Sequence, residues 1–257
     1  MLGGSVKEIE RFAFAYDSAL VSINIPNSVT SIGNCAFREC KSLTSANISK
    51  SMTEISSETF NGCRSLTSVN IPNSVTSIAK YAFYNCSSLT SIDIPNSVTS
   101  IGEQAFNSCS GLTSIKIPNS VTKIDEGAFS GCTGLKSVVI PNSMKTIDKG
   151  VFYDCTGLTS VTIPNSVTTI GYTAFYNCSG LTSIDIPSSV TTLDDWAFGR
   201  CHAITSITIG TKNPSDIACN ECVFYSDVYG NATLYVPAGS ISAYRNTSPW
   251  SSFNNIK

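Results

Sequence analysis

The chain has 257 residues, of which 13% are charged, and its formal net charge at pH 7 is −2. A charge balance this close to zero argues against a surface for nucleic acid or for an acidic membrane. No apolar run reaches the roughly 18 residues that a membrane-spanning helix needs. The first residues also lack the apolar core of a signal peptide.

One repeat of 23 residues dominates the sequence. Each unit carries a leucine (an isoleucine in the last unit), a phenylalanine and, from the second unit on, a cysteine at fixed positions. The leucine column is Leu20, Leu43, Leu66, Leu89, Leu112, Leu135, Leu158, Leu181 and Ile204. The phenylalanine column is Phe14, Phe37, Phe60, Phe83, Phe106, Phe129, Phe152, Phe175 and Phe198. The cysteine column is Cys40, Cys63, Cys86, Cys109, Cys132, Cys155, Cys178 and Cys201. Such a period is typical of solenoids, so we predict one elongated domain.

Residues 1–19 are predicted to form a partial first coil. Val6, Ile9 and Phe14 align with apolar positions of the next unit, and the charged residues among them provide the polar face that end coils need. The chain begins in the middle of a repeat. We therefore expect further sequence, with or without a signal peptide, upstream of it.

The solenoid proper is predicted to extend over residues 20–210. In the unit at 112–117 (LTSIKI), alternating apolar residues predict a short strand with Ile115 and Ile117 facing the core. A Pro-Asn-Ser turn follows, because proline presets the backbone and the polar side chains satisfy it locally. The next segment, 121–124 (VTKI), is predicted to be a second short strand.

The last part of each unit is expected to contain a short helical turn. In the segment 102–109 (GEQAFNSC), one turn of helix would place Ala105, Phe106 and Cys109 on a single face. The predicted fold is therefore a right-handed, mainly β solenoid. Its coils pair their strands in parallel and share a continuous core of Leu, Ile, Val and Phe.

The cysteine column is interpreted as a row of buried, reduced thiols. Equivalent residues of neighbouring coils lie about 4.8 Å apart, which is within disulfide range. Parallel side chains in a ladder, however, do not point at each other as a disulfide requires. The alternative, a set of disulfides, is therefore disfavoured, and the thiols are expected to pack as small apolar groups.

Residues 211–257 are predicted to be a C-terminal cap, because the 23-residue period stops after Ile209. The segment Leu234-Tyr-Val-Pro237 echoes the strand and proline of the repeat. Residues 241–244 are expected to begin a helix. A cap of this kind would cover the open edge of the sheet.

The unit LTSIxIPNSVTSIGxxAFxxCSG resembles the BspA-like leucine-rich repeat family, and the segment ATLYVPAGSISAY resembles the cap of such arrays. The resemblance extends over nearly the whole chain. Pro118 follows the second inward isoleucine, and Ser120 stands where the general leucine-rich pattern has asparagine. An ordinary horseshoe with long convex helices is therefore not expected. The resemblance implies a secreted or surface-attached protein of bacteria or some protozoa, linked in some members to adhesion.

We considered three kinds of chemistry and expect no enzyme, no metal and no cofactor. Cys201 beside the single histidine, His202, lacks a third orienting group for a nucleophile and base. A zinc site of these two residues with Cys219 and Cys222 has poor spacing, and a disulfide between Cys219 and Cys222, or two free thiols, is favoured instead. Neither a nucleophile elbow nor a phosphate-binding glycine loop occurs.

The candidate binding residues are aromatic side chains that vary between units, beside the Ala-Phe pair that most units carry. These candidates are Tyr81, Tyr84, Tyr153, Tyr172, Tyr176 and Trp196. Tyr153 and Tyr176 hold the same repeat position and are expected to stack about 5 Å apart. Exposed aromatic residues are enriched at recognition sites. The alternative is that each ring only packs on the neighbouring coil.

The expected function is a non-enzymatic extracellular or cell-surface scaffold, monomeric, that binds a protein or glycan on a host or neighbouring cell. Adhesion is the role that the resemblance implies. One alternative is a spacer that presents another domain. Another is binding to ice or a mineral surface through the threonine column from Thr44 to Thr205 and the serine column from Ser45 to Ser206. No nucleic acid partner and no membrane insertion are expected.

Overall fold

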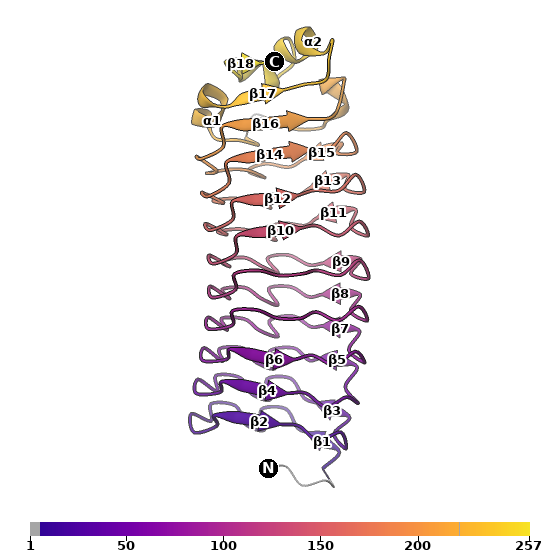
Figure 1. Cartoon of the computed structure of the whole chain (residues 1–257), viewed down its shortest axis with the longest axis vertical. Coiled ribbons are helices and arrows are strands. Elements are labelled where there is room, and N and C mark those ends of the chain that lie inside the picture. The colour runs from indigo at the N-terminus through magenta and orange to yellow at the C-terminus, as the bar shows by residue number, and fades with distance from the viewer. Residues whose placement is uncertain (1–5, 221) are drawn as a thin grey trace.

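The computed structural model describes residues 6–220 and 222–257. It is a stack of coils that rises along one long axis, with helices gathered at the C-terminal end (Figure 1). The first five residues of the predicted coil at 1–19, and Glu221, lie outside the described residues.

Parallel strands line two sides of the stack. On the first side lie β2 (Ser22–Asn24), β4 (Ser45–Asn47), β6 (Ser68–Asn70), β10 (Ser137–Val139), β12 (Ser160–Thr162), β14 (Ser183–Ile186), β16 (Ser206–Ile209), β17 (Thr233–Tyr235) and β18 (Asn255–Ile256). On the second side lie β1 (Glu8–Ile9), β3 (Ser31–Ile32), β5 (Glu54–Ile55), β7 (Ser77–Ile78), β8 (Ser100–Ile101), β9 (Lys123–Ile124), β11 (Thr146–Ile147), β13 (Thr169–Ile170) and β15 (Thr192–Leu193).

The pairing register confirms the predicted β-solenoid of stacked 23-residue coils. Ser137 lies opposite Ser160 in parallel strands, one period later in the sequence. In the coils between β6 and β10 the pairing on the first side is reduced to one bridge, between Asp93 and Lys116. Here too the side chains alternate as predicted, because Ile117 is buried and Lys116 is exposed.

The third side of each coil is here called the corner. The sequence predicts a helical turn there, and this prediction is wrong. The corner comprises residues 102–109 and their equivalents in the other coils. Two corner residues per coil, four positions apart, have a left-handed backbone, such as Gln104 at φ +51° and Ser108 at φ +60°. A left-handed residue interrupts an α-helix. Instead, Phe106 N donates to Ala128 O of the next coil at 2.8 Å, so the backbone bonds run along the stack.

The core is built from columns of identical side chains. The phenylalanine rings from Phe14 to Phe198 stack with centroid separations of 5.2 to 5.6 Å. All members from Phe37 onward are fully buried. Because each coil repeats the same apolar positions, burial continues from coil to coil without a boundary.

All eight thiols of the cysteine column are free and fully buried, as predicted. The structure adds a role that the sequence did not reveal. Each thiol donates a hydrogen bond to the backbone carbonyl of the phenylalanine in the preceding coil; Cys109 Sγ, for example, lies 3.1 Å from Phe83 O. Cysteine suits this position because its thiol is both apolar enough for the core and a weak donor.

The stack continues past the last regular unit. Phe224 extends the phenylalanine column at 5.5 Å from Phe198, and β17 pairs with β16, placing Thr233 opposite Ser206. The spacing between these partners exceeds 23 residues, which hides the additional coil from a search by period. The end of the regular repeat near residue 210 is therefore not the end of the stacking.

Short helices and β18 close the C-terminal end. The helices are η1 (Pro214–Asp216), α1 (Ser226–Asn231), α2 (Ile241–Arg245) and η2 (Trp250–Ser252). The predicted strand at Leu234 and the predicted helix at 241–244 are both present as β17 and α2. Tyr244 is fully buried, and its hydroxyl donates to Thr211 O at 2.7 Å. No helix within the described residues has the length and apolar character to cross a membrane.

Candidate functional site

Side chains at the corner differ from coil to coil, and three corner columns carry this variation through the middle and C-terminal coils. The first corner column contains Lys80, Glu103, Glu126, Lys149, Tyr172 and Asp195. The second contains Tyr81, Gln104, Gly127, Gly150, Thr173 and Trp196. The third contains Tyr84, Asn107, Ser130, Tyr153, Tyr176 and Gly199. Consecutive members are one coil apart, so each column is a row of side chains along the stack axis.

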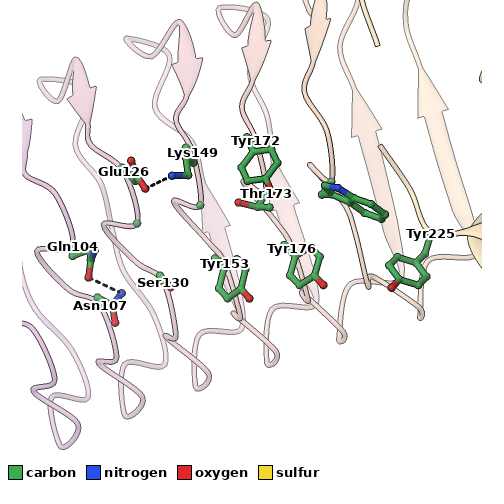
Figure 2. A pocket seen from close by; sticks show the side chains of 13 residues that line it. Gln104, Asn107, Glu126, Ser130, Lys149, Tyr153, Tyr172, Thr173, Tyr176 and Tyr225 are labelled. Carbon is green, nitrogen blue, oxygen red and sulfur yellow. Dashed lines mark hydrogen bonds and ion pairs between the residues drawn. The ribbon is translucent and has the colours of Figure 1, made fainter. Parts of the chain in front are cut away.

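A groove of about 500 Å³ opens over these columns from the coil of Gln104 to the coil of Tyr225 (Figure 2). Its floor includes Gly127 and Gly150, both left-handed glycines of the second corner column. In the other seven coils the equivalent left-handed residue carries a side chain. A Cβ placed on Gly150 would meet no atom closer than 3.7 Å. The groove therefore arises from two missing side chains in a backbone that is otherwise repeated.

Aromatic rings gather at the C-terminal part of this groove. Tyr153 and Tyr176 stack with centroids 5.1 Å apart and an interplanar angle of 7°, which confirms the predicted stacking. Tyr172 lines the groove from the first corner column and is 45% exposed. Trp196 contacts Tyr225 at 5.6 Å, and both rings line the groove. Four of the six predicted aromatic residues thus share one site.

Gly199 makes room for two of these rings. A Cβ on Gly199 would lie 2.7 Å from Cδ2 of Tyr176 and 3.1 Å from Cε3 of Trp196. Any side chain there would displace the rings.

Tyr225 is a groove residue that the sequence analysis missed. It follows Phe224, which pairs with Phe198, and so occupies the third corner position of the next coil. The irregular spacing hid this equivalence. A usable signal was present, because the Val-Phe-Tyr at 223–225 repeats the Val-Phe-Tyr at 151–153.

Charged and amide side chains line the N-terminal part of the groove. Glu126 Oε1 and Lys149 Nζ form an ion pair at 2.7 Å, and this bond raises the pKa of Lys149. Asn107 Nδ2 donates to Gln104 Oε1 at 3.4 Å. Burial raises the pKa of Tyr153, so its hydroxyl is protonated at neutral pH. The groove therefore combines neutral rings, two amides and one internally compensated ion pair.

Tyr81 and Tyr84, the other two predicted aromatic residues, lie outside the groove lining. They contact each other edge to face at 5.8 Å. Tyr81 donates its hydroxyl proton to Glu103 Oε1 at 3.0 Å, and this hydrogen bond raises the pKa of Tyr81. The ammonium group of Lys80 lies 5.3 Å from the Tyr81 ring centroid. Tyr81 and Tyr84 therefore contact each other, and Tyr81 also contacts Glu103 and Lys80.

The considered zinc site does not assemble. Among the described residues, no group of three or more His, Cys, Asp or Glu side chains is placed to hold a metal ion. Cys201 instead donates to Phe175 O at 3.1 Å, and His202 Nδ1 lies 2.7 Å from Asp227 Oδ2. Cys219 and Cys222 are two free, partly buried thiols, which is one of the two arrangements predicted for them.

The threonine columns have a structural role. Thr67 Oγ1 donates to Thr44 O at 3.0 Å, and on the second side Thr76 Oγ1 donates to Thr53 O at 3.1 Å. In most coils the threonine hydroxyl of these columns thus donates to a carbonyl group of the preceding coil. This accounts for the repetition of threonine without any external ligand.

Comparison with known families identifies the repeat. The model of the BspA type leucine-rich repeat region matches residues 7–136 and 126–227, with 6 copies. The chain belongs to the BspA-type leucine-rich repeat family. Members of this family are built from repeats that serve as scaffolds, which agrees with the coil architecture described above. A search of curated proteins gave no match.

Three solved structures that are similar to this BspA-type chain come from bacteria. A leucine-rich repeat protein from Bacteroides ovatus is 31% identical with a TM-score of 0.81, over 98% of this chain and 64% of that one. The T. pallidum leucine-rich repeat protein is 29% identical with a TM-score of 0.62, over 68% and 82% of the two chains. The pneumococcal vaccine antigen PcpA shares the fold at 20% identity and a TM-score of 0.63, over 98% and 70%. The chain thus spans less than two thirds of the Bacteroides ovatus protein.

Proposed function

We propose that this BspA-type chain is a non-enzymatic binding scaffold that acts outside the cell, in adhesion, and that the groove contacts the partner. The observation that carries the proposal is the gathering of Tyr153, Tyr172, Tyr176, Trp196 and Tyr225 around one groove. Aromatic side chains offer a large contact area at low conformational entropy cost.

The rigidity of the frame supports this proposal. The groove residues project from a backbone that is hydrogen-bonded to the coils on both sides; Phe152 N, for example, donates to Ala174 O at 2.8 Å. A site on such a backbone is held in place before its partner arrives, and pre-organisation lowers the cost of binding. The extracellular location is supported by the family, and the partner is a protein or glycan of a host or neighbouring cell.

The test is a binding screen of the purified chain against immobilised matrix proteins, glycans and whole cells. A triple variant, Tyr153→Ser with Tyr172→Ser and Tyr176→Ser, is expected to lose binding while keeping the wild-type circular dichroism spectrum. The matched control replaces two exposed tyrosines outside the groove, Tyr16→Ser and Tyr235→Ser, and is expected to bind as the wild type does.

Two outcomes would count against the groove. If the triple variant is folded and binds normally, the partner-binding surface lies elsewhere, and the strand side with its serine and threonine columns becomes the better candidate. If the wild-type chain binds nothing in the screen, the spacer role, in which the stack only presents another domain, replaces the binding role.

A further inference from the structure

The aromatic rings in the groove differ in how many of their faces are covered by neighbouring residues. Tyr176 is stacked on Tyr153 on one side. Gly199 lies against its ring, and the guanidinium carbon of Arg200 is 5.7 Å from its centroid. On the other side of Tyr153, the third corner column continues with Ser130, which has no ring. Tyr153 therefore has one ring face that no aromatic neighbour covers, and its side chain lines the groove between Ser130 and Tyr176 (Figure 2).

We infer that the open face of Tyr153 is a stacking platform for an uncharged sugar ring, and that the groove binds a neutral oligosaccharide. This inference rests on the proposed binding function and names the chemistry of the partner. One face of a pyranose ring carries mainly C–H groups, which suit the face of an aromatic ring. Its hydroxyl groups point outward in the plane of the ring and need polar partners.

Those polar partners stand beside the platform. Gln104 and Asn107 line the groove, and each amide offers both donors and acceptors, which is what a hydroxyl group requires. Glu126 adds carboxylate oxygens as acceptors at the opposite rim of the groove. Apolar surface with a few polar groups that fix orientation is the usual composition of a ligand site.

The charges favour a neutral ligand over a cation. Aromatic groups can bind ammonium ions through their faces, but here Glu126 is already paired with Lys149 at 2.7 Å. A second cation, Arg200, stands beside Tyr176. No uncompensated carboxylate among these residues is left to attract a quaternary ammonium group.

The dimensions favour a short oligosaccharide over a single sugar. The lining runs from Gln104 to Tyr225, five coil spacings along the stack. At about 4.8 Å per spacing this is roughly 24 Å. The volume of about 500 Å³ lies in the range usual for ligand sites.

The experiment titrates the full chain with neutral oligosaccharides and follows tryptophan fluorescence. Trp196 lines the groove, whereas Trp250, the other tryptophan, is fully buried in the cap, so a change in emission reports on the groove. The panel contains maltotetraose, cellotetraose, xylotetraose, N-acetyllactosamine and diacetylchitobiose. Choline is the cationic comparison. We expect saturable binding of at least one neutral sugar and none of choline.

Variants test the position of the site. Tyr153→Ser is expected to weaken sugar binding at least about tenfold, and Gly150→Gln to abolish it by filling the floor. Gln104 shows that glutamine is accepted at this left-handed position, at φ +51°, so Gly150→Gln should fold. Gly150→Ala adds only one methyl group to the floor and should weaken binding less than Gly150→Gln does. Tyr235→Ser, outside the groove, should bind unchanged.

Three results would overturn the inference: no binding of any neutral sugar in the panel, binding of choline instead, or sugar binding that survives Gly150→Gln with the fold intact. The proposed function fails separately from it. If the triple tyrosine variant loses binding to a matrix protein while no sugar binds, the groove is a protein-binding site, and only the sugar chemistry is wrong.

Discussion

The phenylalanine column shows how much a single residue contributes to this stack. Phe106 is fully buried, and its ring lies 5.2 Å from that of Phe83 and 5.4 Å from that of Phe129. Each ring therefore forms part of the core of two neighbouring coils. Removing one leaves a cavity that the repeated backbone on either side holds open.

Phe106→Ala is accordingly expected to lower the free energy of unfolding by about 3–5 kcal/mol, the usual cost of truncating a buried phenylalanine. Urea denaturation followed by circular dichroism measures it. Phe14→Ala is the matched control, because Phe14 is only partly buried at the first coil and should cost less. A loss below about 1 kcal/mol for Phe106→Ala would contradict its place in the core.

At the scale of one structural column, the thiols give the fold a dependence on pH. Burial raises the pKa of Cys40 to about 11 and the pKa values of Cys109 and Cys155 to about 12. Burial also raises the pKa of Cys63, Cys86, Cys132 and Cys178. In the unfolded chain these thiols titrate near 9.0. Above that pH the unfolded chain has lost protons that the folded chain retains.

The direction in which the free energy of unfolding changes with pH follows from the linkage between proton binding and folding. A raised pKa in the folded state stabilises the fold fully below pH 9, and that stability decreases between pH 9 and about 12. Each buried thiol contributes a slope of about 1 kcal/mol per pH unit. We therefore expect a steep fall in the free energy of unfolding from pH 8.5 to pH 10.5 under reducing conditions. The double variant Cys109→Ala with Cys132→Ala should show a shallower fall. Equal slopes for both proteins would mean that these thiols do not titrate on unfolding.

The same columns explain what could be predicted from the sequence. Constant residues such as Leu112, Phe106 and Cys109 identify inward positions, because a column that faces the core in one coil faces it in the others. The left-handed corner was not predictable, since its second column contains residues as different as Gly150, Thr173 and Trp196. Their conformation is imposed by hydrogen bonds to the neighbouring coil, which override local preference.

The groove was only half predicted, for a related reason. Large aromatic side chains that vary between coils, such as Tyr153 and Tyr176, can be recognised in the sequence as candidate binding residues. A cavity depends equally on absent side chains, and Gly127 and Gly150 carry no signal unless they are compared along their column. Tyr225 was missed because the coil that carries it departs from the 23-residue spacing.

At the scale of the whole molecule, coils are interchangeable units that contact only their neighbours. Deleting residues 43–65 removes one full period and joins Ser42 to Leu66, which restores the repeat pattern. We expect this shortened chain to fold cooperatively, with a circular dichroism spectrum like that of the wild type, and to keep any ligand bound at the groove, which lies several coils away.

The control removes half a period, residues 43–54, so that strand positions fall opposite turn positions. This protein should aggregate or unfold at a much lower urea concentration than the full-period deletion. If the two deletions are equally stable, the coils are not held in register by their columns, and the account of the core given above is wrong.

The corner bonds also give one side of the molecule an electrical direction. Gln104 N, Phe106 N and Ser108 N all donate to the next coil toward the C-terminus, and the coils before and after repeat this orientation. Peptide dipoles that point the same way add, as they do along a helix. One whole side of the rod is thus polarised, positive toward the cap and negative toward the first coil. On the strand sides, bonds such as Thr67 N to Thr44 O and Gly102 N to Ile78 O point the other way. The corner therefore has a polarity of its own, although the chain is almost uncharged.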